Sequence, residues 1–192
     1  MNRRFLLLMI IFGAVAPAPG CAPVIIAGGA TAAVASNERR TLGAFVDDES
    51  IEIKARKALN DDPRFGDDIH VNITSMNGIV LLTGEVTTAE LRDAVVAQVR
   101  PIPGIRRIVT EIRVMEPAAF ASSTHDAWIT GMVKTKLLGA QNVKSNQIKV
   151  VTEDSVVYLM GLVSKQEGDA AAEATRTVGG ITRVVKLFEY ID

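Results

Sequence analysis

The residues of this chain that could take part in catalysis are two histidines, one cysteine and several acidic groups. His70 and His125 are far apart in the sequence, and neither belongs to a Ser-His-Asp set, a Cys-His pair or a metal-binding spacing. We therefore expect two surface histidines rather than general bases. The sequence favours a protein that is not an enzyme and that uses no cofactor or metal.

Other charged groups also lack a specific chemical pattern. The acidic clusters Asp47-Asp48-Glu49, Asp61-Asp62 and Asp67-Asp68 lie at expected helix starts and loop ends, where carboxylates favour the helix dipole or are solvated. A calcium site is the less favoured alternative. Arg106-Arg107 is interpreted as a solvated strand end, with a phosphate contact as its alternative. The balance of 21 basic and 22 acidic residues argues against nucleic acid as a partner.

The single cysteine follows an export signal in residues 1–20. Two arginines precede the apolar run from Phe5 to Val15, which is shorter than the roughly 20 residues of a membrane-spanning helix. Ala18-Pro19-Gly20 before Cys21 resembles a bacterial lipobox, although leucine is usual at the position of Ala18. We predict that Cys21 becomes the N-terminus and carries acyl chains, rather than being a free thiol or lying behind a retained anchor.

The residues after the cysteine suggest where the protein is held. Ala22 is not the aspartate that marks inner-membrane retention in enterobacterial-type sorting, so we expect a lipid-anchored, periplasm-facing protein of the outer membrane. Residues 21–47 would form the lipidated N-terminus and a tether.

A second candidate site has the residue types of a lipid-binding helix. At about 100° per residue, the apolar stripe of Ile129, Val133 and Leu137 defines a core-facing side. The opposite side would carry the following residues: Trp128, Gly131, Thr135 and Leu138, with Lys134 and Lys136 flanking them. An exposed tryptophan settles at headgroup level while lysines meet lipid phosphates, as in an interfacial helix.

Two observations bear on this interpretation. The corresponding helix near residue 50 has Ser50 in place of Trp128 and Asn60 in place of Leu138, and Glu49 and Glu52 add negative charge. Residues 48–116 hold 9 basic and 12 acidic residues, against 8 and 8 in residues 125–192. The alternative is that Trp128 packs against the first copy, residues 48–116, or against the interdomain segment from Glu116 to Thr124.

These helices belong to an internal repeat with a period of about 77 residues. Val80 to Val86 aligns with Val157 to Val163, two β-rich apolar runs that each contain a glycine. Thr87-Thr88-Ala89-Glu90 and Ser164-Lys165-Gln166-Glu167 then fit helix-opening capping boxes. Gly104 and Gly180 fit left-handed helix C-caps, and strands follow them.

Each copy therefore predicts the order helix, strand, strand, helix, strand. Asn77-Gly78 favours a hairpin between strands 69–75 and 79–86, and the second copy has strands 148–152 and 156–163. The second helix makes a crossover, so the third strand should lie parallel to the second. We expect an α+β fold of two tandem small domains, each a three-stranded mixed sheet with two helices on one face.

This arrangement resembles the BON domain family, which has the same element order, a glycine ending the second strand and a Gly-Ile/Val pair after the second helix. The signal, the Arg-Arg-Thr-x-Gly segment at Arg39 and the Thr-x-x-x-Trp-Ile-Thr segment at Thr124 are similar to those of dual-BON-domain outer-membrane lipoproteins. The domains would be 48–116 and 125–192, with 117–124 as linker.

The resemblance implies a function in maintaining the outer membrane, by binding anionic phospholipid through the first helix of the second domain. A protein-binding adaptor or chaperone-like module, acting on outer-membrane assembly proteins through sheet edges or an apolar patch, is the alternative.

Overall fold

The computed structural model of the protein describes residues 39–115 and 123–192. The expected signal peptide 1–20, Cys21 and most of the expected tether and linker lie outside these residues. Within the described ranges, no helix is long and apolar enough to cross a membrane.

Both copies have the predicted element order, which confirms the α+β fold. The first copy comprises α2 (Leu42–Asn60), β1 (Ile69–Met76), β2 (Ile79–Val86), α3 (Ala89–Val99) and β3 (Arg107–Val114). The second comprises α4 (Ser123–Gly139), β4 (Ile148–Glu153), β5 (Val156–Val163), α5 (Lys165–Arg176) and β6 (Arg183–Tyr190). Short 3-10 helices, η1 (Gly66–Asp68) and η3 (Ser145–Gln147), precede β1 and β4.

Each copy forms one three-stranded mixed sheet. β1 pairs antiparallel with β2, and β3 returns parallel to β2 after the crossover through α3; β4, β5 and β6 repeat this order. A side chain at Gly84 would place its Cβ 2.0 Å from the carbonyl oxygen of His70, and one at Gly161 would lie 2.5 Å from that of Gln147. Close strand approach thus explains the repeated glycine.

A buried aspartate supports the hairpin turn in each copy. Asn77 and Gly78 are both left-handed, and their backbone N–H groups donate to the carboxylate of Asp48 at 2.7 and 2.9 Å. In the second copy Asp154 and Ser155 are left-handed, and Asp126 accepts from their N–H groups at 2.7 and 2.9 Å. Asp48 is therefore a turn-supporting residue within α2, and its interpretation as a helix-start charge was wrong.

The first helix of each copy begins earlier than predicted. α2 starts at Leu42, where the hydroxyl of Thr41 accepts a hydrogen bond from the N–H of Ala44 at 3.1 Å. Residues 42–47 of the expected tether are thus helical, because a good N-cap extends the helix beyond its core-facing stripe. α4 starts at Ser123, within the expected linker 117–124, so His125 lies inside a helix.

The second helices show one confirmed cap and one shifted cap. Ser164 and Glu167 form the predicted capping box at the start of α5. In the first copy the N-cap is Thr88, whose hydroxyl accepts from the N–H of Leu91 at 3.2 Å, so the box predicted from Thr87 was wrong by one residue. Competition between two adjacent threonines decides the position.

Gly104 and Gly180 adopt the left-handed conformation, with φ of +94° and +85°. They lie in the loops after α3 and α5 and not at the helix ends, where Arg100 and Thr177 hold right-handed caps. The predicted backbone conformation is confirmed, whereas the assignment to a helix C-cap was wrong.

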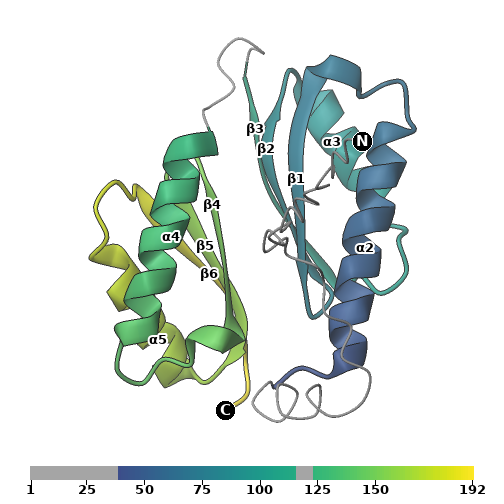
Figure 1. The fold of residues 1–192 in the computed structure, drawn as a ribbon. Coiled ribbons are helices and arrows are strands. Elements are labelled where there is room, and N and C mark those ends of the chain that lie inside the picture. The colour runs from purple at the N-terminus through teal and green to yellow at the C-terminus, as the bar shows by residue number, and fades with distance from the viewer. Residues whose placement is uncertain (1–38, 116–122) are drawn as a thin grey trace, which may run out of the picture.

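The two sheets pack against each other, with helices on the outside of both (Figure 1). α2 and α3 cover the outer face of the first sheet, and α4 and α5 cover that of the second. The inner faces share a third apolar cluster that includes Leu81 of β2 and Tyr158 and Met160 of β5. The sequence predicts two separate sheets, each with helices on one face, but it does not predict that the other faces of the two sheets meet.

Ion pairs surround this interface. Arg106, which directly precedes β3, pairs with Glu189 of β6 at 2.9 Å, and Arg183 of β6 pairs with Glu111 of β3 at 2.7 Å. Lys149 of β4 pairs with Glu52 of α2 at 3.0 Å. Arg106, interpreted from the sequence as a solvated strand end, is therefore an interdomain contact.

The segment before α2 binds to the second copy. The guanidinium of Arg39 donates to both carboxylate oxygens of Glu167, at 2.5 and 2.8 Å, and to the carbonyl oxygen of Leu162 at 3.1 Å. The backbone N–H of Arg39 donates to the side chain of Gln147 at 3.0 Å. The next residue, Arg40, pairs instead with Asp48 of the first copy. These two residues tie the copies together.

The Arg39–Glu167 pair predicts a pH-dependent contribution to stability. The hydrogen bonds from Arg39 lower the pKa of Glu167 from 4.5 to about 2. A carboxylate with a depressed pKa stabilises the fold above its unfolded pKa, and this contribution is lost as the pH falls towards its folded pKa. Glu167→Gln should therefore lower the free energy of unfolding at pH 7, with the difference from the unmodified protein shrinking between pH 4.5 and about 2.

Urea unfolding at a series of pH values measures this difference. Glu173→Gln, at an exposed position of the same helix, is the matched control and should change stability little. A difference for Glu167→Gln that stays constant down to pH 2 would contradict the assignment.

Candidate functional site

Helix α4 has two faces of different chemistry. Ile129, Val133 and Leu137 are buried in the core of the second copy, as the helical spacing predicts. The opposite face lies on the surface: Trp128 is 53% exposed and Leu138 is 75% exposed. The outward orientation predicted for these two side chains is confirmed.

The remaining predicted site residues lie on the same face. Gly131, Lys134, Thr135 and Lys136 are all exposed. The hydroxyl of Thr135 donates to the carbonyl oxygen of Gly131 at 2.9 Å, so it is satisfied within the helix. Apart from the adjoining residues and the backbone of α4 itself, no atom of the described residues lies within 4 Å of the position that a Cβ of Gly131 would take, so this position faces open space.

Sequence reasoning missed one apolar member of this face. Met132 is exposed and lies one helical turn after Trp128. Its spacing of four residues from both Trp128 and Lys136 was the signal that could have identified it. The flexible thioether adds apolar surface that adapts to an irregular partner.

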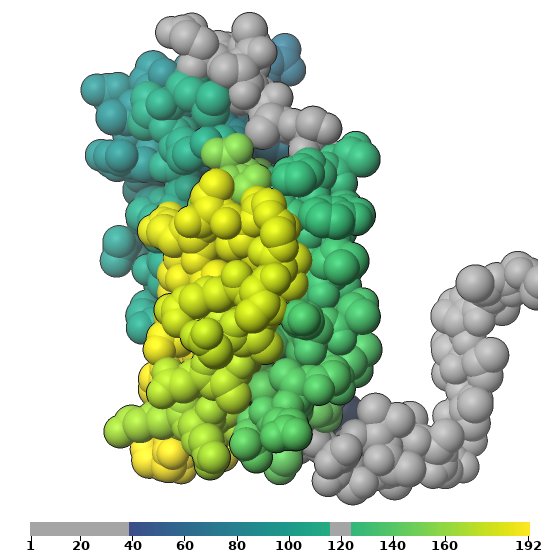
Figure 2. All heavy atoms as spheres, turned by 90° about the vertical axis from the view of Figure 1, so that its left-hand side faces the viewer, coloured from purple at the N-terminus to yellow at the C-terminus, as the bar shows by residue number. Residues whose placement is uncertain are grey.

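The ring of Trp128 stacks on the ring of His125, with centroids 5.9 Å apart and planes 19° from parallel. Both residues belong to α4, so this contact fixes the indole without drawing it into the first copy. In the described residues the structure therefore gives no support to packing of Trp128 against the first copy. Figure 2 shows α4 (green) lying uncovered beside α5 on this side of the molecule.

The lysines of this face are available to a ligand. Within residues 39–115 and 123–192, neither Lys134 nor Lys136 takes part in an ion pair, although most other basic groups near the domain surfaces do. Two cations without an internal partner, on either side of an apolar stripe, form a surface that attracts anions next to apolar groups.

The first helix of the first copy differs from the expected acidic, aromatic-free helix. Ser50 and Asn60 do occupy the positions equivalent to Trp128 and Leu138. However, α2 exposes an apolar patch made of four residues, of which the first three lie in its additional turns: Leu42, Phe45, Val46 and Ile53. We call this the α2 patch. The prediction missed it because it began the helix at residue 48.

Other candidate sites gain no support. No group of three or more His, Cys, Asp or Glu side chains suitable for a metal occurs among the described residues. His125 stacks on Trp128, and Asp62 binds Arg64, whose hydrogen bonds lower the pKa of that carboxyl. Burial raises the pKa of the Tyr158 hydroxyl in the interface between the sheets.

Comparisons with known proteins match this architecture. The model of the BON domain matches residues 47–116 and 125–192. The chain is 34% identical over 185 residues to the outer membrane lipoprotein DolP of Haemophilus influenzae, covering 96% of each chain. It is 34% identical over 152 residues to a 21 kDa hemolysin of Actinobacillus pleuropneumoniae, covering 79% of this chain and 78% of that one.

A more distant relative is the osmotically-inducible protein Y of Escherichia coli. The two proteins are 27% identical over 146 residues, which cover 74% of this chain and 72% of the other.

Proposed function

Because this chain belongs to the BON domain family and carries two such domains in tandem, we propose that it is an envelope lipoprotein that binds anionic phospholipid through α4. By this contact it helps to maintain the integrity of the outer membrane. The protein acts by binding and not by catalysis. The observation that carries the proposal is the outer face of α4, where Trp128 and Leu138 are exposed between two lysines that make no ion pair within residues 39–115 and 123–192.

The physical basis is the match between this face and a bilayer surface. The indole and the leucine enter the boundary between headgroups and acyl chains, while Lys134 and Lys136 meet phosphate oxygens. Each lysine contributes about 1 kcal/mol, and this attraction is screened by salt. Contact through α4 alone is therefore weak, and a covalent lipid has to supply residence on the membrane.

Cys21 is the residue proposed to supply that anchor. The similar protein of Haemophilus influenzae is named an outer membrane lipoprotein, which supports the same location and modification here. A single acyl chain holds a protein only marginally, whereas several chains hold it durably. With Cys21 acylated, the domains face the periplasm and α4 repeatedly meets the membrane surface.

The role of α4 predicts a specific loss on mutation. Trp128→Glu places a charge where an apolar ring should enter the bilayer, and it should reduce binding to phosphatidylglycerol vesicles at least tenfold. Because Trp128 is exposed, the variant should remain folded. Vesicle co-sedimentation measures this binding. Raising the salt concentration should weaken the binding of the unmodified protein to the vesicles.

Ser50→Glu is the matched control, since Ser50 occupies the same helical position in the first copy. It should leave vesicle binding unchanged. Equal co-sedimentation of the Trp128→Glu variant and the unmodified protein would rule out α4 as the contact.

The proposed anchor predicts the mass of the mature N-terminus. Mass spectrometry of the protein extracted from membranes should find a chain that begins at Cys21 and carries acyl groups. Replacement of Cys21 by Ser should release the protein from membranes on washing with salt. A mature chain with an unmodified Cys21, or one that begins elsewhere, would refute acylation.

The α2 patch favours a second function, in which the protein is an adaptor for outer-membrane assembly proteins. The patch lies on the helix layer opposite to α4, because the two sheets separate the helix pairs (Figure 1). Phe45 of this patch lines a pocket together with Lys134 of α4, whereas Val46 and Ile53 do not line that pocket. A flat membrane in contact with α4 would therefore leave Val46 and Ile53 free for a protein partner.

This second function predicts that the two surfaces can be separated. A variant with Val46→Glu and Ile53→Glu should bind phosphatidylglycerol vesicles as the unmodified protein does, yet fail to restore envelope integrity in cells that lack the protein. Detergent sensitivity of complemented cells measures this. Full complementation by the double variant would contradict an adaptor function of the α2 patch.

A further inference from the structure

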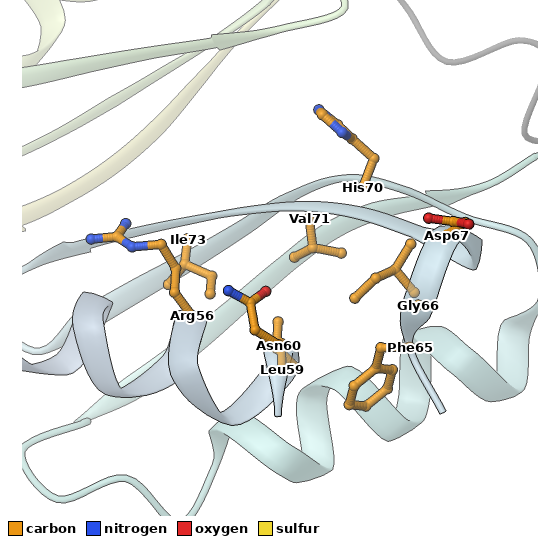
Figure 3. A pocket seen from close by; sticks show the side chains of 10 residues that line it. Arg56, Leu59, Asn60, Phe65, Gly66, Asp67, His70, Val71 and Ile73 are labelled. Atoms are coloured by element: carbon orange, nitrogen blue, oxygen red, sulfur yellow. The ribbon is translucent and has the colours of Figure 1, made fainter. Parts of the chain in front are cut away.

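The two copies contain grooves at equivalent positions, between the second half of the first helix and the free edge of the first strand. In the first copy the groove has a volume of about 470 Å³ and lies beside β1 (Figure 3). In the second copy it has a volume of about 310 Å³ and lies beside β4. Most lining residues of the second groove correspond to lining residues of the first at a shift of 77 or 78 positions. The two grooves therefore have the same place in the fold but different side chains.

The lining of the two grooves differs in polarity. In the first copy the polar side chains of Asn60, Asp67 and His70 line the groove together with five apolar residues; Figure 3 shows Asn60 near Arg56 and Asp67 at the other end of the groove. In the second copy the position of Asn60 is taken by Leu138. The second groove is lined by four apolar residues, Leu137, Leu138, Ile148 and Val150, with the polar residues Lys134, Ser145 and Asn146.

The basic residues that line the two grooves also differ in their ion pairing. Arg56 lies 3.4 Å from the carboxylate of Glu52 and is therefore partly neutralised. Its counterpart Lys134 makes no ion pair within the described residues. Both grooves have apolar linings, but only in the second is the lining cation without an ion pair among the described residues. A ligand that complements this groove has an apolar chain next to an anionic group.

We propose that the groove between α4 and β4 binds one acyl chain of an anionic phospholipid, whose phosphate lies against Lys134. This inference rests on the proposed function and deepens it, since α4 would bind an individual lipid molecule in addition to lying on a membrane surface. Leu138 links the two modes, because it belongs to the exposed face of α4 and also forms a wall of the groove.

The position of the groove suits this ligand. When the outer face of α4 rests at headgroup level, the groove on the Lys134 side opens into the same layer, where a chain needs to leave the bilayer only in part. The volume lies near the lower end of the range of roughly 300–1,000 Å³ for small-molecule sites, which suits one chain rather than a whole lipid.

A lipid that remains monomeric separates groove binding from adsorption to a surface. The probe is dihexanoyl phosphatidylglycerol below its critical micelle concentration, added to the whole chain after the signal peptide with Cys21→Ser. We expect saturable binding of one lipid per chain, with NMR shifts of the methyl groups of Ile148 and Val150. The equivalent residues Val71 and Ile73 of the first copy should not shift.

Three comparisons define the chemistry. Lys134→Gln should weaken binding of the monomer about fivefold, which corresponds to the loss of one lysine–phosphate contact. Ser145→Phe should fill the groove and weaken monomer binding at least tenfold while the exposed face of α4 stays intact. Inorganic phosphate should bind far more weakly than the lipid, because it lacks the chain.

The outcomes distinguish this inference from the proposed function. Vesicle binding without saturable monomer binding would overturn the groove and leave the α4 surface standing. Monomer-induced shifts at Trp128 and Lys136 alone, or equal binding of inorganic phosphate, would also overturn it. Loss of binding to both vesicles and monomer in the unmodified protein would overturn both. The NMR shifts of the methyl groups of Ile148 and Val150 are measured without any change to the groove. They therefore test the inference even if Ser145→Phe fails to fold.

Discussion

The packing of one sheet against the other is the interaction on which the rest of the structure depends. Every residue of β2 is buried, and the middle of β5 is buried as well, because each strand has helices on one side and the other sheet on the opposite side. A three-stranded sheet with two helices is a small core by itself, and sharing the second face enlarges it. The sheets then form the centre of the molecule, and the helices are forced to its outside.

This constraint determines what the helices can do. α2 and α4 each bury one stripe, and each keeps an outer face that no element of the described chain covers. Because the sheet pair lies between them, these outer faces are directed to different sides and are free to diverge. The duplication thus keeps two equivalent scaffolds, whose exposed residues differ: an apolar patch at the start of α2, and an indole and a leucine between cations on α4.

The sequence allowed the repeat unit to be predicted because its signals are local or evenly spaced. The Asn77-Gly78 turn, the Ser164 cap and the stripe from Ile129 to Leu137 each follow from backbone preferences or helical period. The outward position of Trp128 followed from the same period. The start of α2 was missed because nothing buried marks residues 42–47, and the role of Asp48 was missed because its partners lie about 30 residues away.

The packing of the two sheets against each other does not follow from local signals in the sequence. Val80-Leu81-Leu82 and Val157-Tyr158-Leu159 are continuous apolar runs, whereas a sheet with one solvated face alternates apolar and polar residues. This pattern indicates that both faces of each sheet are buried, but it does not show which element covers the second face. The grooves beside β1 and β4 could not be predicted from the sequence either, because they depend on the space between a helix and a strand edge.

The attachment of Arg39 to the second copy bears on how the weak membrane contact proposed for α4 would suffice. Residues 22–38, which number 17, span at most roughly 60 Å even when fully extended. Since Arg39 is bound to Gln147 and Glu167, this length is counted from the copy that carries α4 and not from the first copy. If Cys21 is acylated and held in a membrane, as proposed, α4 would meet that membrane as an intramolecular event at an effective concentration of the order of millimolar. Two lysines and an indole need supply only a modest affinity, which leaves the contact reversible and sensitive to the lipids that it meets.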